Sequence, residues 1–203
     1  LVSVVLPAPI LPAIATCISG ILAINTAADY INAGQYEHVV VIGIDVLSDF
    51  IVFGFQSLFA ISADNTMPFD KKRTGINIGE VATSVLVTKD KTKLVGEAVT
   101  ILGEASCNDA NHISGPSRTG EGLFRSVERA INQAKLKPND IDYISAHGTA
   151  TLFNDEMEAI AFNRLGLQET PLNSLKGYFG HTLGASGLLE TIIGMHSLNQ
   201  NTL

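Results

Sequence analysis

Tryptophan is absent from the 203-residue sequence, cysteine occurs only twice, and charged residues make up just 16% of the chain. Two cysteines, Cys17 and Cys107, are too few for a disulfide framework, and no Cys-x-x-Cys pair offers zinc ligands. We therefore expect a reducing compartment, by default the cytoplasm. Basic residues are also scarce, since 13 Lys and Arg against 20 Asp and Glu give a formal net charge of −7. That balance argues against a nucleic-acid partner.

No charge precedes Asp29, which raises the question of a membrane anchor or an export segment. Pro7, Pro9 and Pro12 interrupt any spanning helix, and no basic residue precedes the apolar run as it does in a signal peptide. The cysteine that follows Thr16 is placed as in a lipoprotein cleavage site, but threonine fits that site poorly. We expect a buried strand followed by a core helix, and no membrane partner.

Apolar residues are abundant, at 46% of the chain, and they follow helical and extended patterns in turn. The β-branched run at 38–44 is typical of a strand covered on both faces. Helix and strand alternate in both halves, which predicts an α/β fold with a mainly parallel, layered sheet. The expected helices are 18–34, 121–136, 154–166 (capped by Asn154) and 184–198. The expected strands are 38–44, 141–149, 171–181, and the pair 79–90 and 94–106, which we expect to form a hairpin.

Cys17 lies at the predicted start of the first helix. The helix dipole and the free N–H groups of a first turn lower a thiol pKa and stabilise the thiolate. A thiolate there is a nucleophile, and a backbone amide of the same turn is an oxyanion donor. The alternative is an inert buried cysteine, which is common in apolar surroundings.

His147 and His181 each follow a predicted strand and stand beside a glycine, so both imidazoles can point into one pocket at the strand ends. Lys176 can orient a histidine or supply a charge, or it can be an ordinary surface lysine. Asp155 and Glu158 share a helical face and can accept from Lys176 or join the histidines at a metal. Tight metal-ligand spacing is missing, so we expect no metal. The motifs GxGxxG and GxxxxGK(S/T) are absent too, and we expect no cofactor.

Four segments resemble, in the same order, the motifs of the β-ketoacyl-(acyl carrier protein) synthases, decarboxylating condensing enzymes with the thiolase fold. ATCISG at 15–20 resembles the nucleophile segment TACxSG, and PFDKKRTGINIGE at 68–80 resembles PFDxxRxGFxxGEG. HGTATLFNDEME at 147–158 resembles HGTGTxxxDxxE, and NSLKGYFGHTLGASG at 173–187 resembles NSxKxxxGHxxGAAG. The chain departs from these patterns in the order of Ala15-Thr16 and in Val81, which replaces the second glycine of GEG.

The resemblance implies a role for each matching residue. Cys17 is the implied nucleophile, and His147 and His181 bind the malonyl thioester carbonyl and stabilise the enolate left by decarboxylation. Lys176 and Glu158 complete the implied catalytic set, with Asp155 as structural support of the polar network. The implied substrate-binding residues are Thr149, Thr151 and Ser114 (in DANHISGP, similar to DAxHxTxP) for the phosphopantetheine arm, and Phe55 (in FGFQSL) for the acyl pocket.

Members of this family are about twice as long, so the resemblance implies an incomplete portion of a thiolase-like layered α/β fold. Residues 1–105 match the end of the N-terminal half and residues 106–203 the start of the C-terminal half. The implied activity is chain elongation in fatty-acid or polyketide synthesis. The implied partners are an acyl carrier protein bearing acyl or malonyl phosphopantetheine and a second subunit, as a homodimer or a heterodimer. Two alternatives stay open: a non-catalytic subunit resembling chain-length factors, and an acyltransferase or thiolase that uses the same cysteine.

Overall fold

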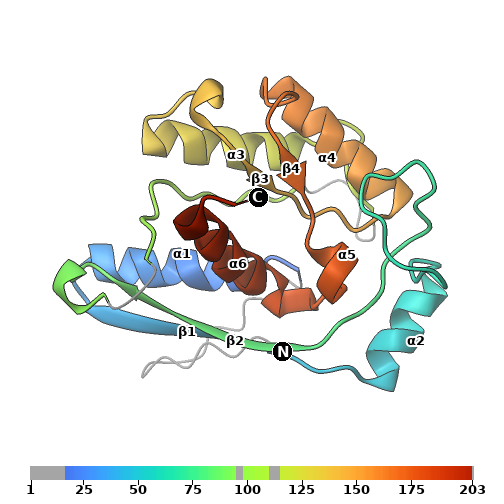
Figure 1. Ribbon diagram of the computed structural model, residues 1–203, viewed down its shortest axis with the longest axis horizontal. Helices are drawn as coiled ribbons and strands as arrows, with labels where there is room; N and C mark the ends of the chain where they lie inside the picture. The colour runs from blue at the N-terminus through green and yellow to red at the C-terminus, as the bar shows by residue number, and fades with distance from the viewer. Residues whose placement is uncertain (1–16, 95–97, 110–114, 203) are drawn as a thin grey trace. The chain divides into compact units, whose positions relative to one another are not determined.

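The computed structural model describes residues 17–94, 98–109 and 115–202 (Figure 1). The chain forms two compact units, and each unit is assembled from segments that are distant in the sequence. Unit 1 comprises residues 17–48, 78–94, 98–100 and 181–202. Unit 2 comprises residues 49–77, 101–109 and 115–180.

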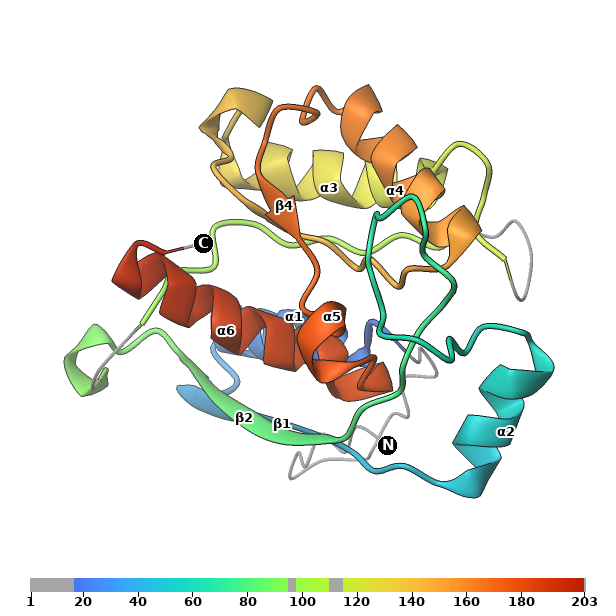
Figure 2. The same cartoon turned by 45° about the vertical axis from the view of Figure 1, so that its right-hand side comes forward.

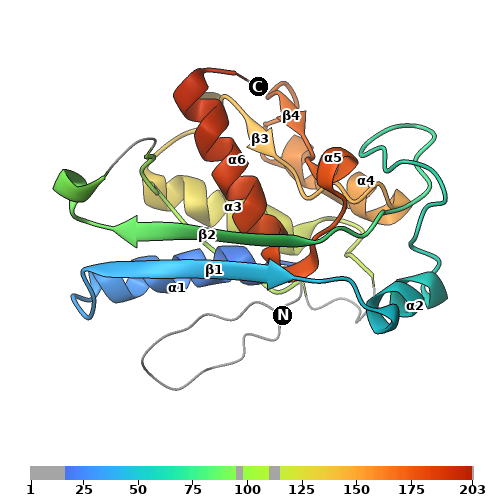
Figure 3. The ribbon, with the colours of Figure 1, turned by 60° about the horizontal axis from the view of Figure 1, so that its bottom comes forward.

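Unit 1 is a two-stranded sheet with two helices packed against it. Strands β1 (His38–Asp45) and β2 (Val81–Thr88) run side by side in opposite directions, from the pair His38 and Thr88 to the pair Asp45 and Val81 (Figure 3). Helices α1 (Ser19–Asn32) and α6 (Ser186–Gln200) cover the sheet, and the short helices η1 (Lys91–Lys93) and η3 (Leu183–Ala185) complete the unit. Its core consists of Ala23, Ile24, Ala27, Ile31, Val39, Val41 and Leu188.

The sheet of unit 1 corrects two sequence-based predictions. Val39 and Val41 of β1 are buried, whereas Val40 is 51% and Ile44 is 44% exposed, so the prediction of a strand covered on both faces is wrong here. The predicted hairpin is also wrong, because β2 pairs with β1 and the described residues of 94–106 form no strand. Strand pairing joins segments far apart in the chain, and a local pattern does not encode it.

Unit 2 contains two helices over a short parallel pair of strands (Figure 2). Strand β3 (Ile144–Ser145) pairs with β4 (Leu172–Asn173), and α3 (Glu121–Ala134) packs against α4 (Leu152–Arg164). Helix α2 (Asp49–Ser57), the short helix η2 (Pro138–Asp140) and the single turn α5 (Lys176–Phe179) complete this unit. Its core consists of Ala146, Phe162, Leu165 and Leu167, with Leu123, Phe124, Val127, Ile141, Ile144 and Phe69 packed against them.

The mixed α/β class predicted from the sequence is confirmed, although the sheet is not mainly parallel: β3 and β4 are parallel and the longer pair is antiparallel. Helix α4 begins at Leu152, so Asn154 lies inside the helix and the predicted cap is wrong. The strand expected before Cys17 and the suggested lipoprotein segment lie outside the described residues. The division near residue 105 stays a prediction. Within the described ranges, no helix is long and apolar enough to cross a membrane.

Candidate active site

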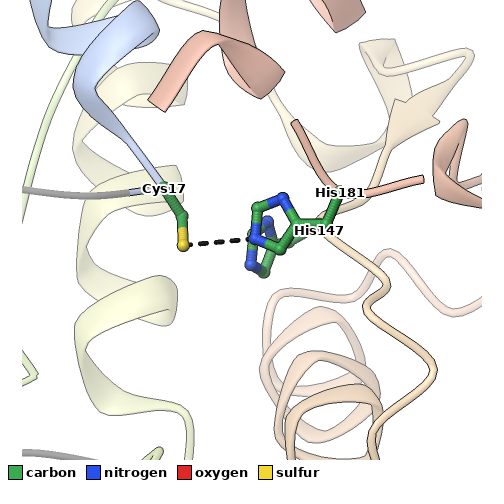
Figure 4. A group of neighbouring side chains, drawn as sticks. All are labelled: Cys17, His147 and His181. Carbon is green, nitrogen blue, oxygen red and sulfur yellow. Dashed lines mark hydrogen bonds between the residues drawn. The ribbon is translucent and has the colours of Figure 1, made fainter. Parts of the chain in front are cut away.

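Cys17 and His181 meet in unit 1. The sulfur of Cys17 lies 3.2 Å from Nε2 of His181, in a hydrogen bond drawn in Figure 4. His181 is only 2% exposed, whereas Cys17 is half-buried and stays accessible. Cys17 also stands two residues before the start of α1 at Ser19, next to the N-cap Ile18, and the N-terminus of this helix carries the positive end of the helix dipole. An imidazole and a helix N-terminus both favour the thiolate, so this cysteine has the surroundings of a nucleophile.

The backbone on both sides of His181 is fixed by the strands of unit 1. His181 forms a parallel bridge with Ile78, and its carbonyl accepts a hydrogen bond from the N–H of Gly79 at 3.1 Å. Four residues later, the N–H of Ala185 donates to Oδ2 of Asp45 at 2.8 Å. Asp45 ends β1 and is buried, so its carboxylate anchors the turn that follows the histidine. The sequence analysis missed Asp45, although a single acidic residue closing an apolar run is a visible signal.

Helices α1 and α6 approach closely enough to need glycine. A Cβ atom built on Gly187 lies 2.7 Å from Cγ1 of Ile21, which is nearer than side chains tolerate. Gly187 thus allows the helix after the histidine to pack on the helix after the cysteine, which helps to bring the two side chains together within this unit.

In unit 2, the loop 147–151 carries His147 and is held by Glu158 of α4. Oε2 of Glu158 accepts the N–H of His147 at 2.9 Å, and Oε1 accepts the N–H of Gly148 at 2.8 Å. The amide of Asn154, one turn earlier on α4, donates to Oε1 at 2.6 Å. Both oxygens of the carboxylate are therefore engaged by donors, as a loop anchor requires, rather than left open for a metal.

Asp155 holds the same loop from the preceding turn of α4. Its Oδ1 accepts the N–H of Ala150 at 3.1 Å, and its Oδ2 accepts the N–H of Phe69 at 2.7 Å. The Nε atom of Arg73 lies 3.6 Å from Oδ2. This buried carboxylate therefore ties the loop to the segment around 68–73, as expected for a structural support.

Glu158 is 2% exposed, and its environment is electrostatically costly for a negative charge. Burial raises the pKa of Glu158 to about 7, against the effect of the hydrogen bonds from Gly148, Asn154 and His147. The neighbouring carboxylate of Asp155 adds to the rise. Glu158 therefore changes charge near neutral pH, at the point where it holds the loop of His147.

Ser174, which was not among the predicted site residues, also binds the loop of His147. Its Oγ donates to the carbonyls of Gly148 at 2.8 Å and His147 at 3.2 Å. Gly148 has φ of 42°, and a Cβ atom there lies 2.5 Å from Cβ of Ser174, so only glycine fits. Lys176 follows two residues later, is 2% exposed, and donates its backbone N–H to Ser174 Oγ at 3.4 Å. The alternative of a surface lysine is wrong.

The predicted substrate-binding residues have different settings. The hydroxyls of Thr149 and Thr151 lie 2.8 Å apart on the loop of His147. Phe55 is half-buried on α2, and Ser114 lies outside the described residues. The carboxylate of Asp109 accepts the N–H groups of Ser117 at 2.7 Å and Gly122 at 2.9 Å. Burial raises the pKa of Asp109, but these hydrogen bonds outweigh it, so the pKa lies below its usual value.

Two family models match the sequence. The model described as "Beta-ketoacyl synthase, C-terminal domain" matches residues 98–203, about half of the chain. The model described as "3-Oxoacyl-[acyl-carrier-protein (ACP)] synthase III" matches residues 13–102.

A curated relative, 3-oxoacyl-[acyl-carrier-protein] synthase 2 of Coxiella burnetii, is 30% identical over 97% of this chain and 51% of its own length. A solved ketosynthase in complex with its chain length factor, from Xenorhabdus doucetiae, has a TM-score of 0.86 at 35% identity over 91% of this chain and 45% of its own. A ketosynthase solved with its type II polyketide acyl-carrier protein has a TM-score of 0.82 at 28% identity, over 90% of this chain and 48% of its own.

These structures confirm the expected incomplete thiolase-like fold, since the chain spans about half the length of the relatives it matches. The matched C-terminal domain contains the loop of His147 with its anchors Glu158 and Asp155, and also Lys176 and His181. On this evidence the chain belongs to the β-ketoacyl synthase family.

Proposed function

We propose that the full-length protein containing this chain condenses an acyl group held on Cys17 with malonyl-(acyl carrier protein), with loss of carbon dioxide. The observation that carries the proposal is the 3.2 Å hydrogen bond between Cys17 Sγ and His181 Nε2 at the start of α1. In the first step the Cys17 thiolate attacks the carbonyl of an acyl thioester and expels the thiol of the carrier. The acyl group is then held as a thioester on the enzyme.

Decarboxylation of the malonyl thioester creates the nucleophile for the second step. The electron pair of the breaking carbon–carboxylate bond moves into an enolate, whose oxygen needs hydrogen-bond donors. The proton that the Cys17 thiol gave to His181 leaves with the carrier thiol in the first step, so His181 is neutral again when the malonyl thioester binds. With its hydrogen on Nε2, this imidazole is the proposed first donor. His147 is the proposed second donor. The enolate carbon attacks the acyl carbonyl, the bond to Cys17 sulfur breaks, and a β-ketoacyl carrier thioester leaves.

The anchors of the His147 loop support the proposed role of that histidine. Glu158 accepts the N–H groups of His147 and Gly148, and Asp155 accepts that of Ala150, so the loop is held before substrate arrives. Such preorganisation is the main source of electrostatic catalysis. We propose Lys176 as a buried charge within this machinery.

The remaining predicted residues are assigned to the substrate. Thr149, Thr151 and Ser114 would hydrogen-bond the phosphopantetheine arm, and Phe55 would line the acyl pocket. The solved relatives in complex with an acyl-carrier protein and with a chain length factor support a carrier protein and a second subunit as partners. The choice between a homodimer and a heterodimer, the cytoplasmic compartment, and the fatty-acid or polyketide pathway stay predictions.

Mass spectrometry of the full-length protein tests the proposal. After incubation with acyl carrier thioesters, the peptide containing Cys17 should gain the mass of the acyl group, and the Cys17→Ala variant should gain none. Release of carbon dioxide from malonyl-(acyl carrier protein) should be lost in His181→Ala. A thiolase would acylate Cys17 without this release, and a subunit resembling chain-length factors would do neither. Absence of an acyl adduct on Cys17 with every thioester would overturn the proposal.

A further inference from the structure

The side chain of Asn154 contacts Glu158, the anchor of the His147 loop. It lies one helical turn before Glu158 on α4, and its Nδ2 donates to Glu158 Oε1 at 2.6 Å. The same oxygen accepts the N–H of Gly148 at 2.8 Å. Among these three donors, the Asn154 amide belongs to a side chain, and the other two belong to the backbone.

The three donors favour the charged form of Glu158. An ionised carboxylate accepts strongly at both oxygens, whereas a protonated one carries a hydroxyl hydrogen and accepts more weakly. Protonation of Glu158 would therefore weaken the contacts to Asn154, His147 and Gly148. Two of these contacts fix the backbone of the loop, so the charge of Glu158 and the position of His147 are linked.

The charge of Glu158 is finely balanced. Burial raises its pKa to about 7 and Asp155 adds to the rise, while the Asn154 amide acts in the opposite direction. From the other elements of unit 2, Arg73 pairs with Asp155, His147 supplies its N–H, and the buried Lys176 lies on α5. Because this pKa is already near 7, the loss of one donor to the charged form is enough to neutralise most of Glu158 at physiological pH.

We propose that Asn154 is a positioning residue, whose amide keeps Glu158 in the charged form that binds the loop and so holds His147 ready for decarboxylation. The proposal rests on the proposed function for its catalytic consequence, but not for its effect on Glu158. Sequence reasoning assigned Asn154 to a helix cap, and the start of α4 at Leu152 leaves it free for this other task.

The test compares the full-length wild type with Asn154→Ala and with Asn154→Gln, which keeps an amide. Asn163→Ala is the matched control, because Asn163 is an exposed asparagine on the same helix. Decarboxylation of malonyl-(acyl carrier protein) is measured from pH 5.5 to pH 9. We expect the acid limb of kcat to move up by about one pH unit in Asn154→Ala. It should return part of the way in Asn154→Gln, and the control should match the wild type.

A second readout needs no activity. Asn154 stabilises the charged form of Glu158 more than the neutral form, so Asn154→Ala should lower the thermal unfolding temperature more at pH 8 than at pH 5.5. An equal loss at both pH values, or an acid limb that does not move, would overturn the proposal. If the wild type itself shows no decarboxylation, the proposed function fails, and the unfolding comparison still decides the role of Asn154.

Discussion

Asp45 and Ala185 are joined across 140 residues of sequence by a 2.8 Å hydrogen bond from the backbone N–H of Ala185 to the Asp45 carboxylate. Both residues are buried, and the contact lies four residues after His181. The end of β1 therefore determines where the chain goes after the histidine that meets Cys17.

Replacing Asp45 should loosen this turn. Asp45→Ala leaves the buried N–H of Ala185 without its acceptor, and we expect a loss of about 1–3 kcal/mol in the free energy of unfolding. Asp45→Asn keeps an oxygen acceptor and should lose clearly less. Denaturant unfolding of the full-length variants measures both. Equal losses of unfolding free energy in Asp45→Ala and Asp45→Asn would mean that Asp45 does not stabilise the protein through its hydrogen bond to Ala185.

The reactivity of Cys17 should depend on His181. The imidazole accepts the thiol proton and so produces the nucleophilic thiolate. In His181→Ala we expect iodoacetamide to alkylate Cys17 at least about tenfold more slowly near neutral pH. Peptide mass spectrometry follows the reaction, and Cys107 in the same sample is an internal control whose rate should stay the same. An unchanged rate at Cys17 would contradict a functional pairing of the two groups.

Gly148 should tolerate no side chain. Gly148→Ala combines the strain of a positive φ with a Cβ atom 2.5 Å from Ser174 and 2.9 Å from the Phe69 ring. We expect a loss of about 3 kcal/mol in the free energy of unfolding. Gly194→Ala is the matched control, because Gly194 lies inside α6 with open space around its Cβ position, and it should gain about 0.5–1 kcal/mol. Similar thermal unfolding temperatures for the two variants would refute the strained contact.

The pH dependence of stability should reveal Glu158. Its pKa is raised from 4.5 to about 7 in the folded protein, so the folded state binds the proton more tightly than the unfolded state does. The contribution of Glu158 to the free energy of unfolding therefore increases as pH falls from about 7 to 4.5. Compared with Glu158→Gln, which does not titrate, the wild type should gain about 3 kcal/mol over that window. A difference that stays constant with pH would show that Glu158 has an ordinary pKa.

Helices were predictable from the sequence because their signals are local. The predicted helix at 121–136 is found at Glu121–Ala134, and the one at 184–198 at Ser186–Gln200. The strands were harder, because the partner of His38 is Thr88, and nothing near either residue encodes that pairing. The segment after residue 94 resembled a second strand of a hairpin only because it follows β2 directly.

The candidate site was predictable where it depends on side chains in recognisable motifs. Cys17 and His181 both stand in such motifs, and Cys17 Sγ lies 3.2 Å from His181 Nε2. Ser174 was missed because it acts on main-chain carbonyls, which leave no trace in a residue pattern. The predicted role of Asn154 as a helix cap was wrong because asparagine also suits a contact with the residue four positions later in a helix. The two roles can be distinguished only when the first residue of the helix, here Leu152, is known.

Glu158, Asp155 and Ser174 grip the loop of His147 through its N–H and C=O groups alone. These contacts therefore fix the backbone path of the loop, and they do not depend on the side chains of most of its residues. Replacing the side chains of Thr149 and Thr151 should therefore leave the path of the loop largely unchanged. The proposed contacts of these two hydroxyls with the phosphopantetheine arm can then be varied without moving the backbone of His147.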